Sequence, residues 1–439
     1  MKSGIILTAL VFLSITAFSA THYVPDNYAT IQGAIDASSN GDVVIVKPGT
    51  YVENIDFLGK AITVQSEKGA AVTIIDGNQA NNVARFTNSE GRDSVLEGFT
   101  LTNGFATTDT NNQGGGIYLD SSSPSILRNI VFGNYAPNDG GGIYTKDVSS
   151  PAIVGNHVIN NICDDRGGGI YISSYSTAEV VNNLIVSNLS NNEGGGVGFH
   201  ESTPTLVNNT ISHNIANLGG GLMAKGSSNP LVVNSIIWDN TAYIGYSEIY
   251  SWNGGIVTAK YSDIRGGWPG TGNIDADPLF TESANNDYHL TWNSPCRDKG
   301  DNSYVTESHD FEGDFRVALN TVDMGADEYY YHLYHVGDVI PGSPIDIKVV
   351  GYPSAPITLY LGSGIQDPPL STQYGDLWLN WPPLWQGNIG KVQSNGVLVF
   401  SATVPTSWMS GSEQPLQALV GPMSGPWTRL ANLEVLVVE

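Results

Sequence analysis

The chain has 439 residues, with 42 acidic residues against 18 Lys and Arg and a net charge of −24 at pH 7. This charge excludes a nucleic-acid-binding protein, which needs a basic face for phosphate. The 51 glycines exclude a helical bundle because glycine is costly inside helices, and two cysteines exclude a disulfide scaffold or a four-cysteine zinc site.

The N-terminus has the pattern of an export signal. Lys2 precedes an apolar stretch over residues 5–18, and the small residues Ser19 and Ala20 follow. The stretch is shorter than the ~20 residues that a membrane-spanning helix needs. We therefore predict a signal peptide at residues 1–20 and an exported protein, secreted or held at the cell surface, with no transmembrane segment after signal removal.

Residues 21–92 are predicted to form an N-terminal cap and the first coils of a solenoid. Thr30, followed by Ile31, Ala34 and Ile35, is typical of a short amphipathic helix with an N-cap. Such a helix would cover the open apolar end of the rod, which needs a cap. Short strands are expected next, at 43–46, 61–64 and 72–75.

Residues 93–272 form a repeat. A Gly-Gly-Gly triplet recurs five times, beginning at residues 114, 140, 167, 194 and 219. Each triplet precedes a short apolar strand, and a second apolar stretch with asparagines follows about a dozen residues later. The period of about 25–27 residues is too short for a propeller blade and lacks long amphipathic helices, so it predicts a parallel β-helix. The triplets permit positive φ and close backbone approach at a turn.

Two sets of side chains recur in register along this rod. The first is an asparagine ladder with a structural role, in which each amide bonds to the next coil. Its predicted members are Asn129, Asn156, Asn183, Asn209 and Asn234. The second set shares one outward position on three successive coils: Tyr118, Tyr144 and Tyr171. These tyrosines form either a sugar-stacking stripe or an ordinary ladder packed under a loop, and both interpretations stay open.

Charged residues precede the glycine triplets. Asp139, Asp165, Arg166 and Glu193 are the candidate catalytic residues. Two carboxylates on adjacent coils would suit a glycoside hydrolase. A lyase would need Arg166 or Lys146 as its base, together with a cation such as Ca²⁺. The alternative is a set of solvated turn residues without chemistry.

The segment 273–330 is rich in aspartate and is predicted to close the rod. Its nine aspartates make Ca²⁺ the one cofactor that the sequence suggests, although the EF-hand spacing is not met. Cys163 lies in a turn and Cys296 in this segment, and whether they pair as a disulfide stays open.

The last part of the chain, residues 331–439, has a different pattern. Short apolar runs are separated by Gly and Pro turns, which predicts a small β-sandwich. Five tryptophans are concentrated here, and they either form a carbohydrate-stacking surface or fill the core. They are Trp378, Trp381, Trp385, Trp408 and Trp427.

Three stretches resemble known families. The run YVPDNYATIQGAIDASSNGDVVIVKPGTYVENIDFLGKAITV at 23–64 resembles the opening coil of right-handed parallel β-helix proteins of the pectin-lyase-like group. The GGGIY repeats are similar to those of adhesin-like outer-membrane proteins. Residues 273–328, with DADPLF, DYHLTWNSPCRDKGD, DFEGDFR and VDMGADEY, resemble the tail of secreted bacterial β-helix proteins with variable surface anchors. The resemblance implies the fold and export.

The resemblance implies no particular reaction. The characteristic strings of pectin methylesterases, polygalacturonases, pectate lyases and alginate epimerases are absent from the sequence. We therefore expect an all-β protein, a right-handed parallel β-helix followed by a β-sandwich. Two functions stay open: a monomeric glycan-binding or adhesive protein whose partner is a polysaccharide or cell-surface glycan, and a polysaccharide lyase or glycoside hydrolase.

Overall fold

The computed structural model describes residues 19–317 and 321–329 without interruption. Further along the chain it describes 333–336, 339–341, 343–350, 356–361, 365–372, 375–379, 385–391, 397–405, 413–420 and 429–437. The predicted signal peptide at 1–20 lies almost wholly outside the described residues. Within these ranges, no helix is both long and apolar enough to cross a bilayer.

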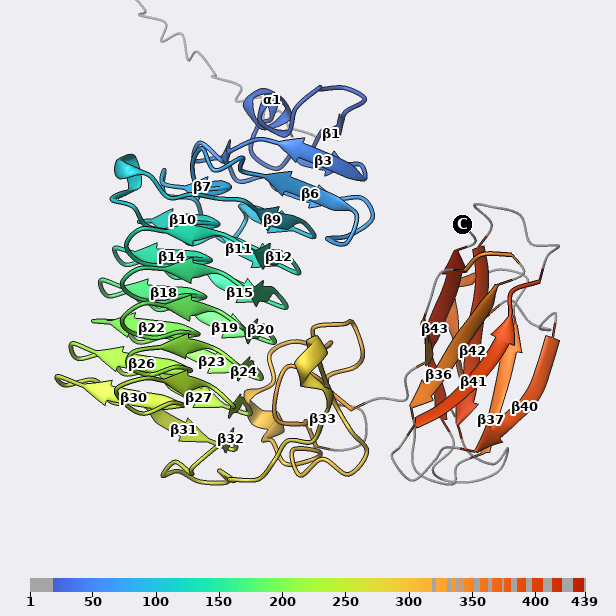
Figure 1. The fold of residues 1–439 in the computed structure, drawn as a ribbon. Coiled ribbons are helices and arrows are strands. Elements are labelled where there is room, and N and C mark those ends of the chain that lie inside the picture. The colour runs from blue at the N-terminus through green and yellow to red at the C-terminus, as the bar shows by residue number, and fades with distance from the viewer. Residues whose placement is uncertain are drawn as a thin grey trace, which may run out of the picture.

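The larger part of the chain is a solenoid of parallel strands (Figure 1). The ten-stranded sheet contains β1 (Thr21–Val24), β2 (Val43–Val46), β5 (Thr63–Ser66), β8 (Val95–Glu97), β11 (Ser125–Leu127), β15 (Ala152–Val154), β19 (Glu179–Val181), β23 (Thr205–Val207), β27 (Leu231–Val233) and β31 (Thr258–Lys260). The nine-stranded sheet contains β3 (Gly49–Val52), β6 (Thr73–Asp76), β9 (Thr100–Thr102), β12 (Ile130–Phe132), β16 (His157–Ile159), β20 (Leu184–Val186), β24 (Thr210–Ser212), β28 (Ile236–Trp238) and β32 (Asp263–Ile264).

Two shorter sheets complete the coils. The eight-stranded sheet contains β4 (Ile55–Asp56), β7 (Ala84–Phe86), β10 (Ile117–Asp120), β14 (Ile143–Lys146), β18 (Ile170–Ser173), β22 (Val197–His200), β26 (Leu222–Lys225) and β30 (Ile249–Trp252). The five-stranded sheet contains β13 (Tyr135–Ala136), β17 (Ile162–Cys163), β21 (Leu189–Ser190), β25 (Ile215–Ala216) and β29 (Thr241–Ala242). The strands of each sheet come from successive coils, so neighbours along a sheet are one repeat apart in the sequence.

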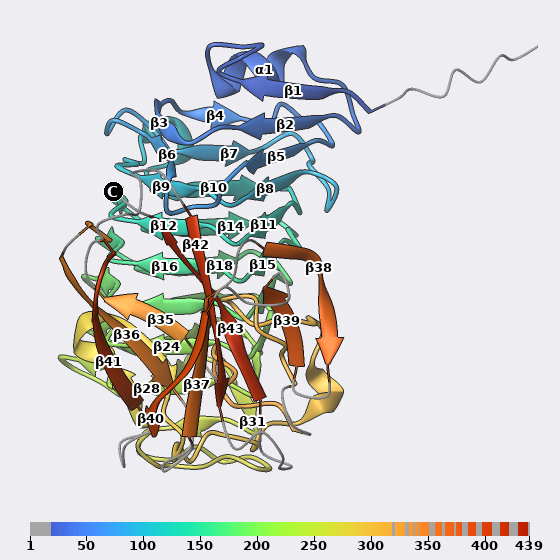
Figure 2. The same cartoon turned by 90° about the vertical axis from the view of Figure 1, so that its right-hand side faces the viewer.

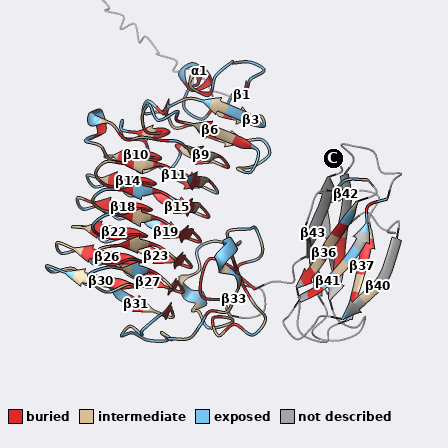
Figure 3. Ribbon diagram, viewed as in Figure 1, coloured by how far each residue is buried: buried red, intermediate tan, exposed pale blue. Residues whose placement is uncertain are grey.

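Alternation of side chains along the strands builds the core. Ile117, Ile143 and Ile170 stand opposite one another on successive coils and are fully buried. Side chains two residues apart on a strand point to the same face, so one set of each strand fills the interior. Figure 3 shows buried residues along every coil of the solenoid. The predicted β-helix is confirmed.

A short helix covers the N-terminal end of the solenoid. Helix α1 (Ile31–Ala37) begins after Thr30, whose side chain accepts a hydrogen bond from the backbone N–H of Gly33. Ile31 and Ile35 are fully buried in the solenoid core. Figure 2 shows the helix at this end of the coils. The predicted amphipathic helix is therefore confirmed, and its apolar side lies where an exposed coil would otherwise meet water.

The segment after the last coil does two things. Near residue 270 it crosses the end of the solenoid: Trp268 packs against the core, and the N–H of Ile264 donates to the carbonyl of Ile274. From about residue 277 it turns back along the nine-stranded sheet (Figure 1). Its elements are β33 (Phe280–Glu282), η2 (Ser283–Asn285), β34 (Asp287–Leu290) and η3 (Asn302–Tyr304); a further 3₁₀ turn, η1 (Thr108–Thr110), lies in an early coil.

The returning segment covers the outer face of the nine-stranded sheet. Tyr288 packs on Leu184 and Val186, which are at most 3% exposed. The amide of Asn182 donates to the carbonyl of His309 at 2.8 Å, and Asn208 reaches the carbonyl of Asp323 at 3.0 Å. We call residues 277–329 the tail.

The C-terminal part forms antiparallel sheets. A three-stranded sheet contains β35 (Leu333–Val336), β36 (Pro344–Val350) and β41 (Val397–Thr403). A four-stranded sheet contains β40 (Trp385–Lys391), β37 (Pro356–Leu361), β42 (Glu413–Val420) and β43 (Arg429–Val437), and β38 (Ile365–Thr372) pairs with β39 (Gly375–Leu379). Ile347, Val349, Ile357 and Leu359 meet in its core, as an all-β sandwich requires. The side chains of the five tryptophans lie outside the described residues.

Candidate functional site

The first asparagine ladder runs inside the turn that follows the ten-stranded sheet. The backbone N–H of Asn129 donates to Oδ1 of Asn156 at 2.9 Å, and the same bond links Asn156 to Asn183 and Asn183 to Asn209. All four side chains are buried. Each amide group also donates to a main-chain carbonyl, which satisfies polar groups that would be costly to bury unpaired.

The prediction for Asn234 was wrong. The N–H of Asn209 donates to the hydroxyl of Ser235 at 3.1 Å, so Ser235 holds the next ladder position. Asn234 precedes it with φ of 50° and bonds instead to the main chain of Asp301 in the tail. On these last coils the ladder position is the second residue of each Asn-Asn or Asn-Ser pair. Asn234 is the first residue of its pair, so counting one asparagine per coil misplaces the fifth member.

A second asparagine ladder accompanies the first. Its members are Asn134, Asn161, Asn188, Asn214 and Asn240. Each side-chain amide donates to the carbonyl oxygen of the next side chain at 3.0 Å. These asparagines recur at the same period as the first ladder, so their spacing in the sequence is a signal for this second ladder as well.

The tyrosine row does not provide a surface for sugar stacking. Tyr118, Tyr144 and Tyr171 point away from the solenoid interior, yet each is at most 4% exposed. Their rings stack at 5.8 and 5.7 Å between centroids. Arg166 lies over the Tyr171 ring, 5.2 Å from its centroid. The first glycine of the triplet lies against the tyrosine on each of these three coils. Of the two interpretations, the structure shows the packed ladder.

The predicted charged residues form a paired row at the turns before the eight-stranded sheet. Arg166 Nε donates to both Asp139 and Asp165 at 3.0 Å. Asp139 is 1% exposed and also accepts from Gln113 at 3.1 Å. Burial raises the pKa of Asp139 to about 6, against the Arg166 charge, which lowers it.

Glu193 takes part in a separate pair on the next coils. It accepts from Lys225 Nζ at 2.9 and 3.1 Å, and Lys225 lies over the Trp252 ring. Asp165 also accepts from Asn192 at 2.7 Å. The row therefore divides into an Asp139–Arg166–Asp165 group and a Glu193–Lys225 group, and in each group the carboxylates are paired with a cation.

This arrangement does not present the groups that the enzyme hypotheses need. A hydrolase requires two carboxyls that both face a substrate, whereas Asp139 is buried and occupied by two donors. A lyase requires a base with an accessible neutral form. Burial opposes the charge of Arg166 and Lys146, but their acidic neighbours raise the pKa of both side chains above the ordinary values, so each stays a cation.

An open hollow lies at the opposite end of the same strands. Its volume is about 260 Å³, and it is lined by Tyr175, Glu201, Ser202, Thr203 and Ser227. These residues belong to the turns that follow β18, β22 and β26 on three successive coils. Tyr175 is 69% exposed, so its ring is accessible beside hydroxyls and a carboxylate.

The hollow lies next to a row of residues at the strand ends. His200, Lys225 and Trp252 stand in register at the last positions of β22, β26 and β30. His200 and Lys225 directly precede two of the turns that line the hollow, and Trp252 is on the next coil. Trp252 is 52% exposed. The sequence carries no signal for this region because Tyr175 and Trp252 occupy different positions of the repeat, and only the stacking of the coils brings these strand ends to one edge.

Most aspartates of the tail and the preceding bend accept hydrogen bonds from backbone N–H groups and so support turns. Asp310 Oδ1 accepts from the backbone N–H groups of Glu312, Gly313 and Asp314 at 2.9–3.0 Å. Asp323 accepts from two further backbone N–H groups. One group in the described residues has metal-ligand geometry, and it includes an imidazole: His289, Glu312 and Asp327.

The two cysteines do not form a disulfide. Cys163 is buried beside Ala106 and Ala136 in the five-stranded part of the solenoid. Cys296 is buried in the tail, where its thiol donates to Asp263 at 3.1 Å. Burial raises the pKa of Cys163 to about 12, which makes it an inert core residue.

The coils also match a known family. Residues 33–189 and 160–265 match the family model described as the right handed beta helix region. The two matches overlap and together span residues 33–265, more than half of the chain. A comparison with curated proteins found no match. From its repeat, its parallel coils and this match, the chain belongs to the right-handed β-helix family.

Proposed function

We propose that the protein is exported and binds neutral glycan chains at the hollow beside Tyr175, without changing them chemically. The observation that carries the proposal is the exposed Tyr175 ring beside the polar groups of Glu201, Thr203 and Ser227. A sugar ring stacks its apolar face on an aromatic side chain, while its hydroxyls bond to neighbouring polar groups. The net charge of −24 favours a neutral chain over a polyanion.

We propose binding without turnover because the charged residues before the glycine triplets are already paired. Asp139, Arg166 and Glu193 are held in ion pairs, and the tyrosines beside them are covered. A secreted or cell-surface location is supported by the signal pattern at 1–20 and by the resemblance of 273–328 to the tail of secreted bacterial β-helix proteins.

The test is affinity electrophoresis of the mature chain in gels that contain neutral polysaccharides. We expect at least one polysaccharide to retard the protein, and Tyr175→Ala to weaken this binding at least tenfold. Tyr243→Ala is the matched control because Tyr243 is 71% exposed but precedes β30, at the other end of the strands. Equal binding by Tyr175→Ala and the wild type would place the site elsewhere.

Incubation of the mature protein with the same polysaccharides distinguishes binding from catalysis. Reducing ends and the ultraviolet absorbance of unsaturated products are followed with Ca²⁺ or with chelator. We expect neither to rise. Reducing ends without absorbance would indicate a hydrolase, and rising absorbance a lyase; either result would contradict the proposal.

A further inference from the structure

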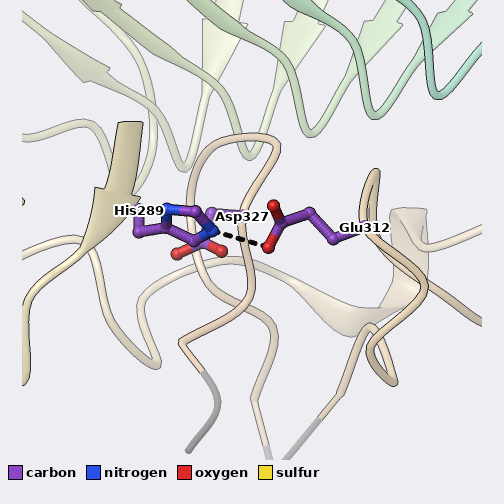
Figure 4. Close-up of side chains that lie close together, drawn as sticks. All are labelled: His289, Glu312 and Asp327. Atoms are coloured by element: carbon purple, nitrogen blue, oxygen red, sulfur yellow. Dashed lines mark hydrogen bonds and ion pairs between the residues drawn. The ribbon is translucent and has the colours of Figure 1, made fainter. Parts of the chain in front are cut away.

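Three side chains from separate stretches of the tail converge on one point. His289 lies on β34, Glu312 on the following loop, and Asp327 on the last loop of the tail. One ligand atom from each lies within 4.8 Å of the other two. Figure 4 shows the Asp327 carboxylate against the His289 ring and Glu312 facing the same ring. Three tetrahedral ligands at ~2.1 Å from one ion lie about 3.4 Å apart, so a small shift of these side chains would bring them to that spacing.

The Asp327 carboxylate is the feature that points to a ligand. Asp327 is 2% exposed, and its Oδ2 accepts from the N–H of Leu290 at 2.7 Å. Its Oδ1 is buried and has no hydrogen-bond partner. A buried carboxylate oxygen without a partner destabilises the folded protein, because water no longer solvates it. A cation beside Oδ1 would remove this cost.

His289 is held in an orientation that suits a metal ligand. Its Nδ1 faces Asp287 Oδ1 at 2.5 Å, and its Nε2 faces Glu312 Oε2 at 2.6 Å. A carboxylate on one ring nitrogen fixes the tautomer and directs the other nitrogen to the metal, as in carboxylate–histidine–zinc arrangements. Glu312 is partly exposed, so the site has a route from solvent.

We propose that His289 Nε2, Glu312 and Asp327 bind one divalent transition-metal ion, with Zn²⁺ preferred over Ca²⁺. Ca²⁺ takes six to eight oxygen ligands, whereas one imidazole and two carboxylates make a donor set that Zn²⁺ accepts, with water in the fourth position. The ion would join β34 to two loops of the tail, the segment that covers β20 and β24. The proposal is independent of glycan binding at Tyr175.

The competing occupant of this centre is a proton. Both ring nitrogens of His289 face a carboxylate oxygen, at 2.5 and 2.6 Å, and a protonated imidazole satisfies both contacts. In that alternative the cluster is an ion-pair network that needs no metal. The two states differ in whether added Zn²⁺ displaces a proton and stabilises the tail, which an experiment can measure.

The experiment uses the mature full-length chain, stripped with EDTA and dialysed. Isothermal titration with ZnCl₂ and with CaCl₂ measures stoichiometry and affinity, and Co²⁺ absorption reports four-coordinate geometry. We expect one equivalent of Zn²⁺, proton release on binding, and at least 100-fold weaker Ca²⁺ binding. Absence of a stoichiometric Zn²⁺ site would overturn the proposal in favour of the ion-pair network.

Variants assign the site to these residues. His289→Gln and Glu312→Gln keep similar shapes, and we expect each to weaken Zn²⁺ binding at least tenfold. Glu282→Gln is the control because Glu282 is an exposed glutamate on the same segment, and it should bind Zn²⁺ as the wild type does. Unchanged affinity in Glu312→Gln would overturn the assignment. Circular dichroism of each variant confirms that it folds before binding is compared.

Discussion

Buried amides stabilise this solenoid because each one bonds to its counterpart on the next coil. In the second ladder, Asn214 donates to Asn240, so the last amide needs a partner of another kind. Glu248 supplies it: Asn240 Nδ2 donates to Glu248 Oε2 at 2.6 Å. Glu248 is 7% exposed, so the ladder ends on a carboxyl that the solenoid largely removes from water.

This end of the ladder predicts a pH dependence. Burial raises the pKa of Glu248 to about 7, above its ordinary value of 4.5. The folded protein therefore keeps a proton that the unfolded chain releases between these values, and stability falls as pH rises through that window. We expect Glu248→Gln to raise the free energy of unfolding by about 2 kcal/mol at pH 8 and to change it little at pH 4.

Urea unfolding of the wild type and the variant at pH 4, 6 and 8 measures this difference. Other buried acids, such as Asp139 and Asp263, titrate in both proteins, so only the difference between the two curves reports Glu248. Parallel curves at every pH would mean that Glu248 ionises in the folded protein at its ordinary pKa.

At the scale of the element, the glycine triplets set how closely the coils approach. A Cβ atom added to Gly168 would lie 2.6 Å from the carbonyl oxygen of Gly195 on the next coil and 2.6 Å from that of Leu189. Both contacts are with backbone, which cannot rotate away. The triplet therefore excludes every other residue for a steric reason, in addition to the positive φ of its first glycine.

We expect Gly168→Ala to destabilise the protein by about 3 kcal/mol, because the methyl group forces two coils apart. Gly91→Ala is the matched control, since no atom lies within 4 Å of its added Cβ, and its effect should stay within about 0.5 kcal/mol. Thermal and urea unfolding measure both. Equal stabilities would show that the turn accommodates a side chain by moving.

The elements were predictable where their cause is local. The Thr30 cap and the apolar spacing of α1 lie within one short stretch, and the coils repeat at one period, so helix and solenoid followed from the sequence. The outward direction of Tyr144 also followed from alternation. Its burial did not, because the turn of its own coil and the neighbouring tyrosine rings cover it.

The candidate sites were less predictable because they depend on which coils meet. Tyr175, Glu201 and Ser227 are about one repeat apart, and only the stacking of three turns makes them one hollow. His289 and Asp327 meet because the tail folds back on itself. Asn234 shows the same limit: the pattern identified an asparagine in each coil but not which residue of the Asn-Ser pair faces the ladder.

At the scale of the whole molecule, the tail is a side layer on the solenoid and is organised around one buried cation. Arg316 is 1% exposed and donates to the carbonyls of Ala326 and Gly325 at 2.6 and 2.7 Å. These carbonyls belong to the last loop of the tail, whose Gly325 N–H donates to Asn234 on the solenoid. One guanidinium therefore holds the loop that docks the tail.

We expect Arg316→Met to release the tail while the solenoid stays folded. The variant leaves buried carbonyls without their donor, at about 3–5 kcal/mol, and this cost falls on the tail because the coils have their own hydrogen bonds. Limited proteolysis should then cut within residues 277–329, and a fluorescent apolar dye should bind to the uncovered face at Leu184 and Val186. Far-ultraviolet circular dichroism should retain the strand signal.

Arg92→Met is the control for this experiment, because Arg92 forms an exposed ion pair with Glu179 on the solenoid, and such pairs contribute little. It should show the protease pattern of the wild type. If Arg316→Met instead unfolds the coils together with the tail, the two parts form one cooperative unit, and the tail supports the solenoid as much as the solenoid supports the tail. If the protease pattern does not change at all, the apolar contacts of Tyr288 with Leu184 and Val186 hold the tail without the guanidinium.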